Sequence, residues 1–199
     1  MPGSLFDRDG VRKYLTARER LAFVYAASKE NPSISTFCLT LAFTGARISE
    51  VLALTAGRID AADEAVIFET LKQRKKRLFR AVPVPHSLIP FLTTYSVGKE
   101  GGLWPWCRTS GWKMVKAVMC KAGIPNSLCK PKALRHAFAV EAGQKAIPLN
   151  IVQRWLGHAR IETTAIYASA IGDEERNLAR RVWSSLELAI PDTQCPHRR

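Results

Sequence analysis

Four stretches of the chain carry side chains of the kinds that bind anions or exchange protons. They are TGARISE at residues 44–50, a basic run at 72–77, KALRH at 132–136, and LGH at 156–158, whose histidine is followed nine residues later by Tyr167. Guanidinium groups hold phosphate oxygens through paired hydrogen bonds, while lysine, histidine and tyrosine can give up or accept a proton. Such a set is suited to chemistry on an anionic substrate.

Other chemistries have no supporting motif in the sequence. There is no GxxxxGK[ST] or GxGxxG loop, so nucleotide hydrolysis and nicotinamide chemistry are not indicated. No DxD cluster or paired histidine spacing offers ligands for magnesium or zinc. The five cysteines are irregularly spaced without a CxxC pair, which favours reduced thiols in the cytosol over a disulfide framework or a zinc site.

The charge balance points to a polyanionic partner. The 199 residues include 30 Lys and Arg against 17 Asp and Glu, a formal net charge of +13. Residues 103–160 hold ten Lys or Arg and a single acid, Glu141, which indicates a basic face rather than an evenly mixed surface. Nucleic acid is the commonest polyanion in the cytosol, and a merely basic, soluble surface is the alternative.

Taken together, the four stretches resemble the catalytic domain of the tyrosine recombinase (phage integrase) family. They match its arginine–lysine–H-x-x-R–histidine–tyrosine order and approximate spacing, and the resemblance runs from about Leu15 to Leu186. It implies a site-specific DNA recombinase that needs no metal or cofactor. Such an enzyme cleaves and rejoins strands through a 3′-phosphotyrosine intermediate, in integration, excision or resolution of mobile DNA.

The resemblance also implies a role for each residue. Tyr167 is the nucleophile, Arg47 and Arg135 hold the non-bridging phosphate oxygens, His158 donates a hydrogen bond to the phosphate, and Lys72 protonates the leaving 5′ oxygen. These roles agree with the chemistry, because negative charge gathers on the non-bridging oxygens during attack and two guanidinium groups can stabilise it.

Several positions keep alternative interpretations. Lys75 and Lys76 compete with Lys72 for the position of the catalytic lysine. Arg47 and His158 could instead cap helices, and Tyr167 could belong to the core. Thr163 and Thr164 are expected only to start a helix. Contacts to DNA are predicted for further basic residues and one histidine: Arg74, Lys75, Lys76, Arg77 and His136.

Lys132 departs from the family pattern, which has histidine at this position of H-x-x-R. A histidine titrates near neutrality and can accept the tyrosine proton, whereas an ordinary lysine is mostly charged. Lys132 could act if Arg47 and Arg135 lower its pKa, or it could contact the phosphate. Type IB topoisomerases, which share this catalytic core, are similar in tolerating a lysine there.

The elements that must position these residues are predicted to be mainly α-helical, with a small antiparallel β-sheet. A Thr16–Glu19 capping box opens the first helix. Residues 72–77 join two strands as a hairpin loop, and Pro83 places the second strand at a sheet edge. Helices are predicted over residues 35–43, 48–54, 87–95, 111–122, 133–145 and 148–156, and strands over 65–70 and 79–84.

We expect a single domain over residues 1–199, with a catalytic core at about 15–171. Only about 15 residues precede the first helix, so no N-terminal core-binding domain is expected, as in short fimbrial recombinases or in a fragment. A helix over 172–190 carries an apolar stripe of Leu178, Val182 and Leu186, suited to docking on a neighbouring subunit or on its own domain.

The expected partners are double-stranded DNA, further copies of the chain as a tetramer on DNA, and accessory DNA-binding proteins. No apolar run is long enough to span a membrane and no signal peptide is recognisable, so a cytoplasmic location is expected. Two other functions stay open: a non-cutting DNA-binding regulator that keeps the fold, and a type IB topoisomerase.

Overall fold

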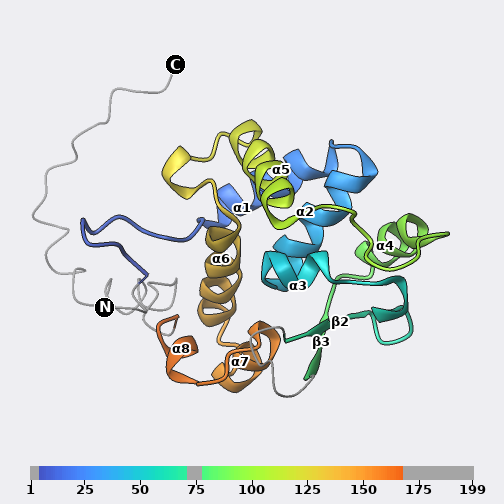
Figure 1. Cartoon of the computed structure of the whole chain (residues 1–199). Coiled ribbons are helices and arrows are strands. Elements are labelled where there is room, and N and C mark those ends of the chain that lie inside the picture. The colour runs from blue at the N-terminus through green and yellow to red at the C-terminus, as the bar shows by residue number, and fades with distance from the viewer. Residues whose placement is uncertain (1–4, 71–77, 168–199) are drawn as a thin grey trace, which may run out of the picture.

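A computed structural model describes residues 5–70 and 78–167, and over these ranges the chain is mainly helical with a small antiparallel sheet, as predicted (Figure 1). The longer helices are α1 (Ala17–Ser28), α2 (Pro32–Thr44), α4 (Leu88–Ser96), α5 (Arg108–Lys121), α6 (Pro131–Gln144) and α7 (Leu149–Leu156). The short elements are α3 (Ile48–Leu52), η1 (Ala56–Arg58), β1 (Ile59–Asp60), β2 (Ala65–Glu69), β3 (Phe79–Pro83), η2 (Asn126–Leu128) and α8 (Glu162–Ala165).

Helix α2 lies at the centre of the main core. It has no charged side chain, its Thr36, Thr40 and Thr44 hydroxyls donate to carbonyl oxygens of its own preceding turn, and α1, α4, α5 and α6 pack against it (Figure 1). Its Phe37 and Leu41 are fully or almost fully buried, and Phe37 makes edge-to-face contacts with Trp104 and Trp106. A helix without a polar face can only be stable inside a core, so the burial predicted for residues 35–43 is confirmed.

The sheet has the order β1-β2-β3, with both pairs antiparallel. In β3 the side chains alternate, so that Arg80 and Val82 are buried while Phe79, Ala81 and Pro83 are exposed. Arg80 stands opposite Phe68 of β2. The prediction of Pro83 on an edge strand is confirmed for the described strands. An arginine on the buried face of a small sheet needs partners for its charge.

Two glycines end helices at positions where the backbone adopts a left-handed conformation. Gly45 ends α2 at φ +60°, and Gly157 ends α7 at φ +63°. A Cβ atom on Gly45 would lie 2.7 Å from the Phe138 ring of α6, so this position also needs the small residue for close packing. Both turns aim the residues that follow them toward the same part of the molecule.

Helix boundaries differ from the sequence predictions where a local cap decides them. The capping box is confirmed, since the Thr16 side chain accepts from the Glu19 N–H and the Glu19 side chain accepts from the Thr16 N–H. Helix α5 begins at Arg108, three residues before the prediction, because Cys107 Sγ accepts a hydrogen bond from the Ser110 N–H. Helix α3 ends at Leu52, two residues early.

The described residues contain no helix both long enough and apolar enough to cross a membrane.

Candidate active site

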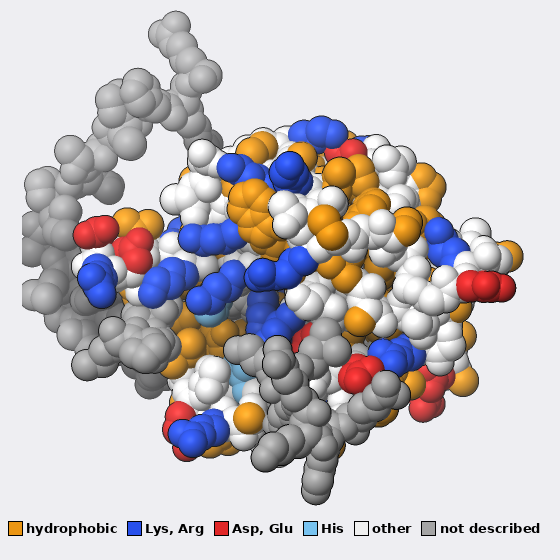
Figure 2. Space-filling view, in the orientation of Figure 1, with side chains coloured by type: hydrophobic (Ala, Val, Ile, Leu, Met, Phe, Trp, Pro, Cys, Tyr) orange, Lys and Arg blue, Asp and Glu red, His pale blue; other side chains and the backbone are white. Residues whose placement is uncertain are grey.

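The predicted catalytic residues of the described ranges surround one cavity of about 1090 Å³. Its charged and titratable lining side chains are Arg47, Glu50, Arg108, Lys130, Lys132, Arg135, His136, His158, Arg160, Glu162 and Tyr167. Six of these side chains are cationic and two are carboxylic acids, so the cavity is suited to an anion. Figure 2 shows a band of Lys and Arg side chains across the face of the molecule that carries this cavity.

Arg47 stands in the short connection between the end of α2 and the start of α3. Its backbone N–H donates to Glu50 Oε2 at 2.8 Å, and its Nη1 donates to Glu50 Oε1 at 2.8 Å. Both terminal nitrogens also lie 3.4 Å from the carbonyl oxygen of Gly157. One carboxylate thus starts the helix and orients the guanidinium group of Arg47 at the cavity.

Glu50 is almost completely buried, with its side chain 1% exposed. Burial by itself raises the pKa of the Glu50 carboxyl, but hydrogen bonds and positive charge from Arg80, together with the N–H and charge of Arg47, lower it overall. Glu50 is therefore ionised in the folded protein at neutral pH and acts as the counter-charge for two arginines.

Arg135, in the second turn of α6, is held by two backbone carbonyls. Its Nη1 donates to Gly45 O at 2.9 Å and its Nη2 donates to Leu156 O at 2.8 Å. Burial, followed by the charge of Arg47, lowers the pKa of Arg135 to about 9. Arg135 stays charged at pH 7, beside a second cation, and an anion between the two would relieve their repulsion.

His158 follows the turn at Gly157, and its Nδ1 shares a hydrogen bond of 2.9 Å with Thr164 Oγ1. Burial, then the charges of Arg135 and Arg47, lowers the pKa of His158 to about 3. The ring is therefore neutral at pH 7 and carries a single N–H. Thr164 is fully buried, so the expectation that it only starts a helix is wrong: it also orients His158.

Tyr167 lies inside the smaller core cluster, where it is 2% exposed. Its hydroxyl shares a hydrogen bond of 2.9 Å with His136 Nδ1, and its ring stacks on His158 with centroids 6.5 Å apart. Burial raises the pKa of Tyr167, against the opposing charges of Arg135 and Arg47. The phenol is thus at the wall of the cavity, but protonated and covered.

His136 lies beneath the surface beside Tyr167. It is 8% exposed, and burial followed by the charge of Lys132 lowers its pKa to about 4. Its Nε2 is buried without a hydrogen-bond partner among the residues the structure describes. His136 also lines the cavity, and the DNA contact predicted for it stays a prediction.

Lys132 is exposed in the first turn of α6 and lines the same cavity as Arg135, one turn away. The predicted lysine Lys72 and the basic residues Arg74, Lys75, Lys76 and Arg77 fall outside the described ranges, as does the helix predicted over 172–190.

Glu50 and Arg80 belong to the site but were not singled out from the sequence. The sequence pattern could have indicated that Arg80 is buried, because Arg80, Val82 and Val84 are spaced two apart and so point to the same face of a strand as two apolar residues. Glu50 follows Arg47 at a spacing of three, which puts both on one side of a helix start.

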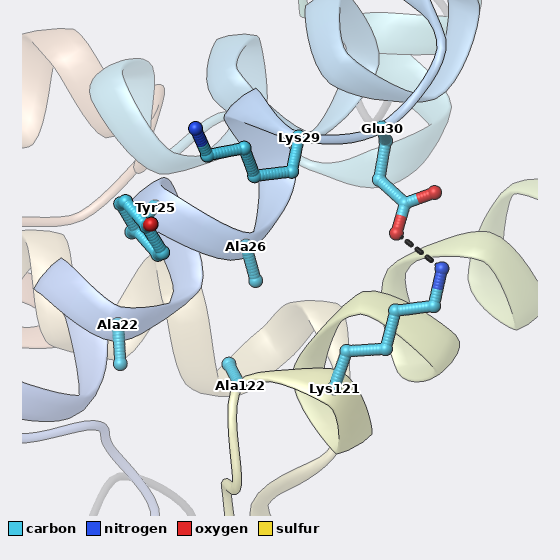
Figure 3. A pocket seen from close by; sticks show the side chains of 7 residues that line it. All are labelled: Ala22, Tyr25, Ala26, Lys29, Glu30, Lys121 and Ala122. Carbon is cyan, nitrogen blue, oxygen red and sulfur yellow. Dashed lines mark hydrogen bonds and ion pairs between the residues drawn. The ribbon is translucent and has the colours of Figure 1, made fainter.

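A second pocket, of about 470 Å³, lies between α1 and α5 and contains none of the predicted residues (Figure 3). Alanines and Tyr25 form its walls, and an ion pair between Lys121 and Glu30 crosses one end. It has no set of side chains suited to catalysis.

Comparison with known proteins places this geometry in a family. The sequence profile of the phage integrase family matches residues 13–172. The tyrosine recombinase XerD of Corynebacterium glutamicum is 30% identical over 148 residues, covering 69% of this chain and 48% of XerD. XerD of Mycobacterium tuberculosis is 31% identical over 180 residues, covering 78% of this chain and 56% of that protein. The chain thus spans about half the length of these curated relatives.

Solved structures show the same fold. The catalytic domain of bacteriophage HP1 integrase aligns with a TM-score of 0.61 at 21% identity, covering 93% of this chain and 98% of that domain. The XerA recombinase aligns with a TM-score of 0.68 at 23% identity, covering 87% of this chain and 62% of its own. Because the family profile covers most of the sequence and solved integrases share the fold, the chain belongs to the phage integrase family, as a tyrosine recombinase catalytic domain.

Proposed function

We propose that this chain catalyses site-specific DNA recombination, cleaving and rejoining strands through a covalent link between Tyr167 and a 3′ phosphate. The observation that carries the proposal is the convergence of Arg47, Arg135, His158 and Tyr167 on one cationic cavity, from segments up to 120 residues apart. Four side chains of three types, with complementary roles in phosphoryl transfer, line one site, as binding and attack at a phosphate require.

In the proposed step the Tyr167 oxygen forms a bond to phosphorus while the bond from phosphorus to the 5′ oxygen breaks. Arg47 and Arg135 bind the two non-bridging oxygens, and neutral His158 donates its N–H to one of them. Lys72 gives a proton to the departing 5′ oxygen. Attack of a 5′ hydroxyl on the phosphotyrosine reverses these changes and returns the proton.

Lys132 accepts the proton that Tyr167 loses, or it makes an additional contact with the phosphate while a water molecule takes that proton. It is exposed at the rim of the cavity, one helical turn from Arg135, where a phosphate held by Arg135 is within reach of its long side chain. Only the neutral amine form of Lys132 can accept this proton, whereas the ammonium form can only donate to the phosphate.

The proposed substrate is duplex DNA, bound by the cationic face around the cavity and by Arg74, Lys75, Lys76 and Arg77. Among structurally similar proteins, XerH is bound to its difH substrate and the Tn1549 integrase to circular intermediate DNA. We further propose a single catalytic domain in the cytoplasm that assembles as a tetramer on DNA, with residues 172–190 docking on a neighbour and accessory proteins at the site.

The test is to capture the covalent intermediate. The full chain is incubated, with EDTA present, with a random-sequence library of duplexes that carry a 5′-bridging phosphorothiolate, whose sulfur leaves without returning. Adducts that survive denaturation are sequenced. We expect adducts with the parent and with Tyr25→Phe, a variant of an exposed tyrosine remote from the cavity, and none with Tyr167→Phe.

An adduct that persists in Tyr167→Phe would refute the assignment of the nucleophile. DNA binding by the parent without any adduct would instead favour the non-cutting regulator.

A further inference from the structure

The least expected side chain near the site is the guanidinium of Arg80, which extends from the sheet to Glu50 in the cavity wall. Arg80 is 7% exposed and lies over the ring of Phe68, 5.4 Å from its centroid. A buried arginine is costly unless its donors are satisfied. Arg80 points to the inner face of β3, whereas its neighbours Phe79 and Ala81 point outward, and its side chain is 5% exposed.

The donors of Arg80 join three segments of the site. Nη2 donates to Glu50 Oε2 at 2.7 Å and Nη1 donates to Glu50 Oε1 at 3.3 Å, while Nη1 also donates to Thr70 Oγ1 at 3.2 Å. Nε donates to the carbonyl oxygen of Trp155 at 2.8 Å, just before the turn that carries His158. Arg80 therefore holds α3, α7 and the sheet in one arrangement.

The turn at Gly157 is shaped around Arg80. A Cβ atom on residue 157 would lie 2.9 Å from the Arg80 Cζ and Nη1 atoms, closer than van der Waals contact allows. The same residue's carbonyl oxygen lies 3.4 Å from both terminal nitrogens of Arg47. Gly157 thus contacts two arginines: its Cα faces Arg80, and its carbonyl oxygen faces Arg47.

Glu50 is the link between Arg80 and the phosphate-binding arginine. Its carboxylate accepts from the Arg47 backbone N–H and Nη1 as well as from both terminal nitrogens of Arg80. Among the described residues, Arg47 and Arg80 are the two cations that are hydrogen-bonded to Glu50. Without Arg80, Arg47 alone would balance the buried negative charge of Glu50. Its guanidinium would be drawn to Glu50 and away from a bound phosphate.

We propose that Arg80 is a positioning residue for strand cleavage, which neutralises and aligns Glu50 so that Arg47 stays available to the scissile phosphate. The inference rests on the proposed function. It assigns Arg80 no contact with DNA: its effect passes through Glu50 to Arg47, and through Trp155 and Gly157 to the turn that carries His158.

The first experiment needs no substrate. Crystal structures are compared for the parent and for Arg80→Met, which keeps an apolar side chain over Phe68. In the parent, one terminal nitrogen of Arg47 already donates to Glu50 Oε1; in Arg80→Met we expect the guanidinium to pair with both Glu50 carboxylate oxygens and to lose its contacts with Gly157 O. An Arg47 that keeps its parental position would overturn the proposal whether or not the chain cleaves DNA.

The second experiment measures the rate of adduct formation on a duplex that the parent has been shown to capture. Arg80→Met should slow adduct formation by about 100-fold, the size of effect seen when one electrostatic contact to a transition state is lost. A scissile methylphosphonate has one charged oxygen fewer and needs the arginines less, so there the loss should be at least about tenfold smaller. An equal loss on both substrates would mean a merely structural role and would overturn the proposal.

Two further variants keep the result interpretable. Arg58→Met is the matched control, because Arg58 also pairs with a carboxylate, Glu69, and lies over an aromatic ring, Phe79. Among the described residues its hydrogen bonds go to Ala53 O and Glu69 rather than to Glu50 or Trp155, so Arg58→Met should cleave like the parent. Arg80→Met with Glu50→Gln removes the unbalanced carboxylate and should recover part of the activity. If it does not, Glu50 is not the link and the proposal fails. A parent without any adduct would refute the proposed function alone.

Discussion

The hydroxyl of Tyr167 and Nδ1 of His136 share a 2.9 Å hydrogen bond inside the smaller core cluster, so the proposed nucleophile is buried. A covered phenol cannot reach a phosphate in the cavity without breaking this bond. The bond to His136 therefore lowers the free energy of the resting position relative to an attacking one.

His136→Phe should release Tyr167. The variant leaves the phenol buried without a partner, at a cost of about 1–3 kcal/mol, which shifts the side chain toward solvent. We expect Tyr167 to be nitrated by tetranitromethane several-fold faster than in the parent, as followed by peptide mass spectrometry. Tyr25, which is 66% exposed, is the internal standard and should react equally in both proteins. Unchanged nitration of Tyr167 would show that His136 does not hold it.

Acid should destabilise the protein through two histidines. The pKa of His136 is lowered to about 4 and that of His158 to about 3, so the unfolded chain binds these protons first. Their contribution to stability is complete above the unfolded value of about 6.5 and is lost as the pH falls toward 4, to the order of 3 kcal/mol for each.

Urea unfolding at pH 7.0, 6.0 and 5.0 measures this loss, in a window above the ordinary titration of Asp and Glu. The double variant His136→Gln with His158→Gln should show a much flatter dependence of the unfolding free energy on pH. His86→Gln, at an exposed residue beside Glu64, is the control and should behave like the parent. A parental slope in the double variant would contradict the prediction.

Lys132 should matter for the rate of cleavage rather than for folding. It is exposed, so Lys132→Ala should leave the thermal midpoint unchanged, but slow adduct formation by about 10²–10⁴-fold if it transfers a proton. Lys132→His should retain substantial activity, because histidine can take the same proton. Lys145→Ala, an exposed lysine paired with Glu141 at the far end of the same helix, is the control. Full cleavage by Lys132→Ala would make Lys132 a surface charge only.

Gly157→Ala should lose more stability than backbone strain explains. A left-handed alanine costs about 1–2 kcal/mol, and here the new methyl group also meets Arg80. Gly98→Ala isolates the strain, because Gly98 has φ +69° and nothing within 4 Å of its missing Cβ. We expect the urea midpoint to fall further for Gly157→Ala than for Gly98→Ala. Equal losses would mean that the Arg80 side chain moves away without cost.

The sequence by itself determined much of the local structure and predicted which residues react. The Thr16–Glu19 capping box spans three residues, and the burial of α2 follows from a run of apolar side chains, so both are readable from neighbours along the chain. The order from Arg47 to Tyr167 likewise needs no coordinates, because residue type and spacing carry it.

Only the tertiary structure decided how these residues are held and charged. Arg80 meets Glu50 from 30 residues away, and Arg135 donates to Gly45 O from 90 residues away. The burial of Tyr167 against His136 depends on how the end of the described chain folds back onto α6. Ion pairing, burial and the resulting pKa shifts arise between segments that are distant in sequence. The interaction of two charges depends on the distance between them and on the medium around them, and spacing along the chain specifies neither.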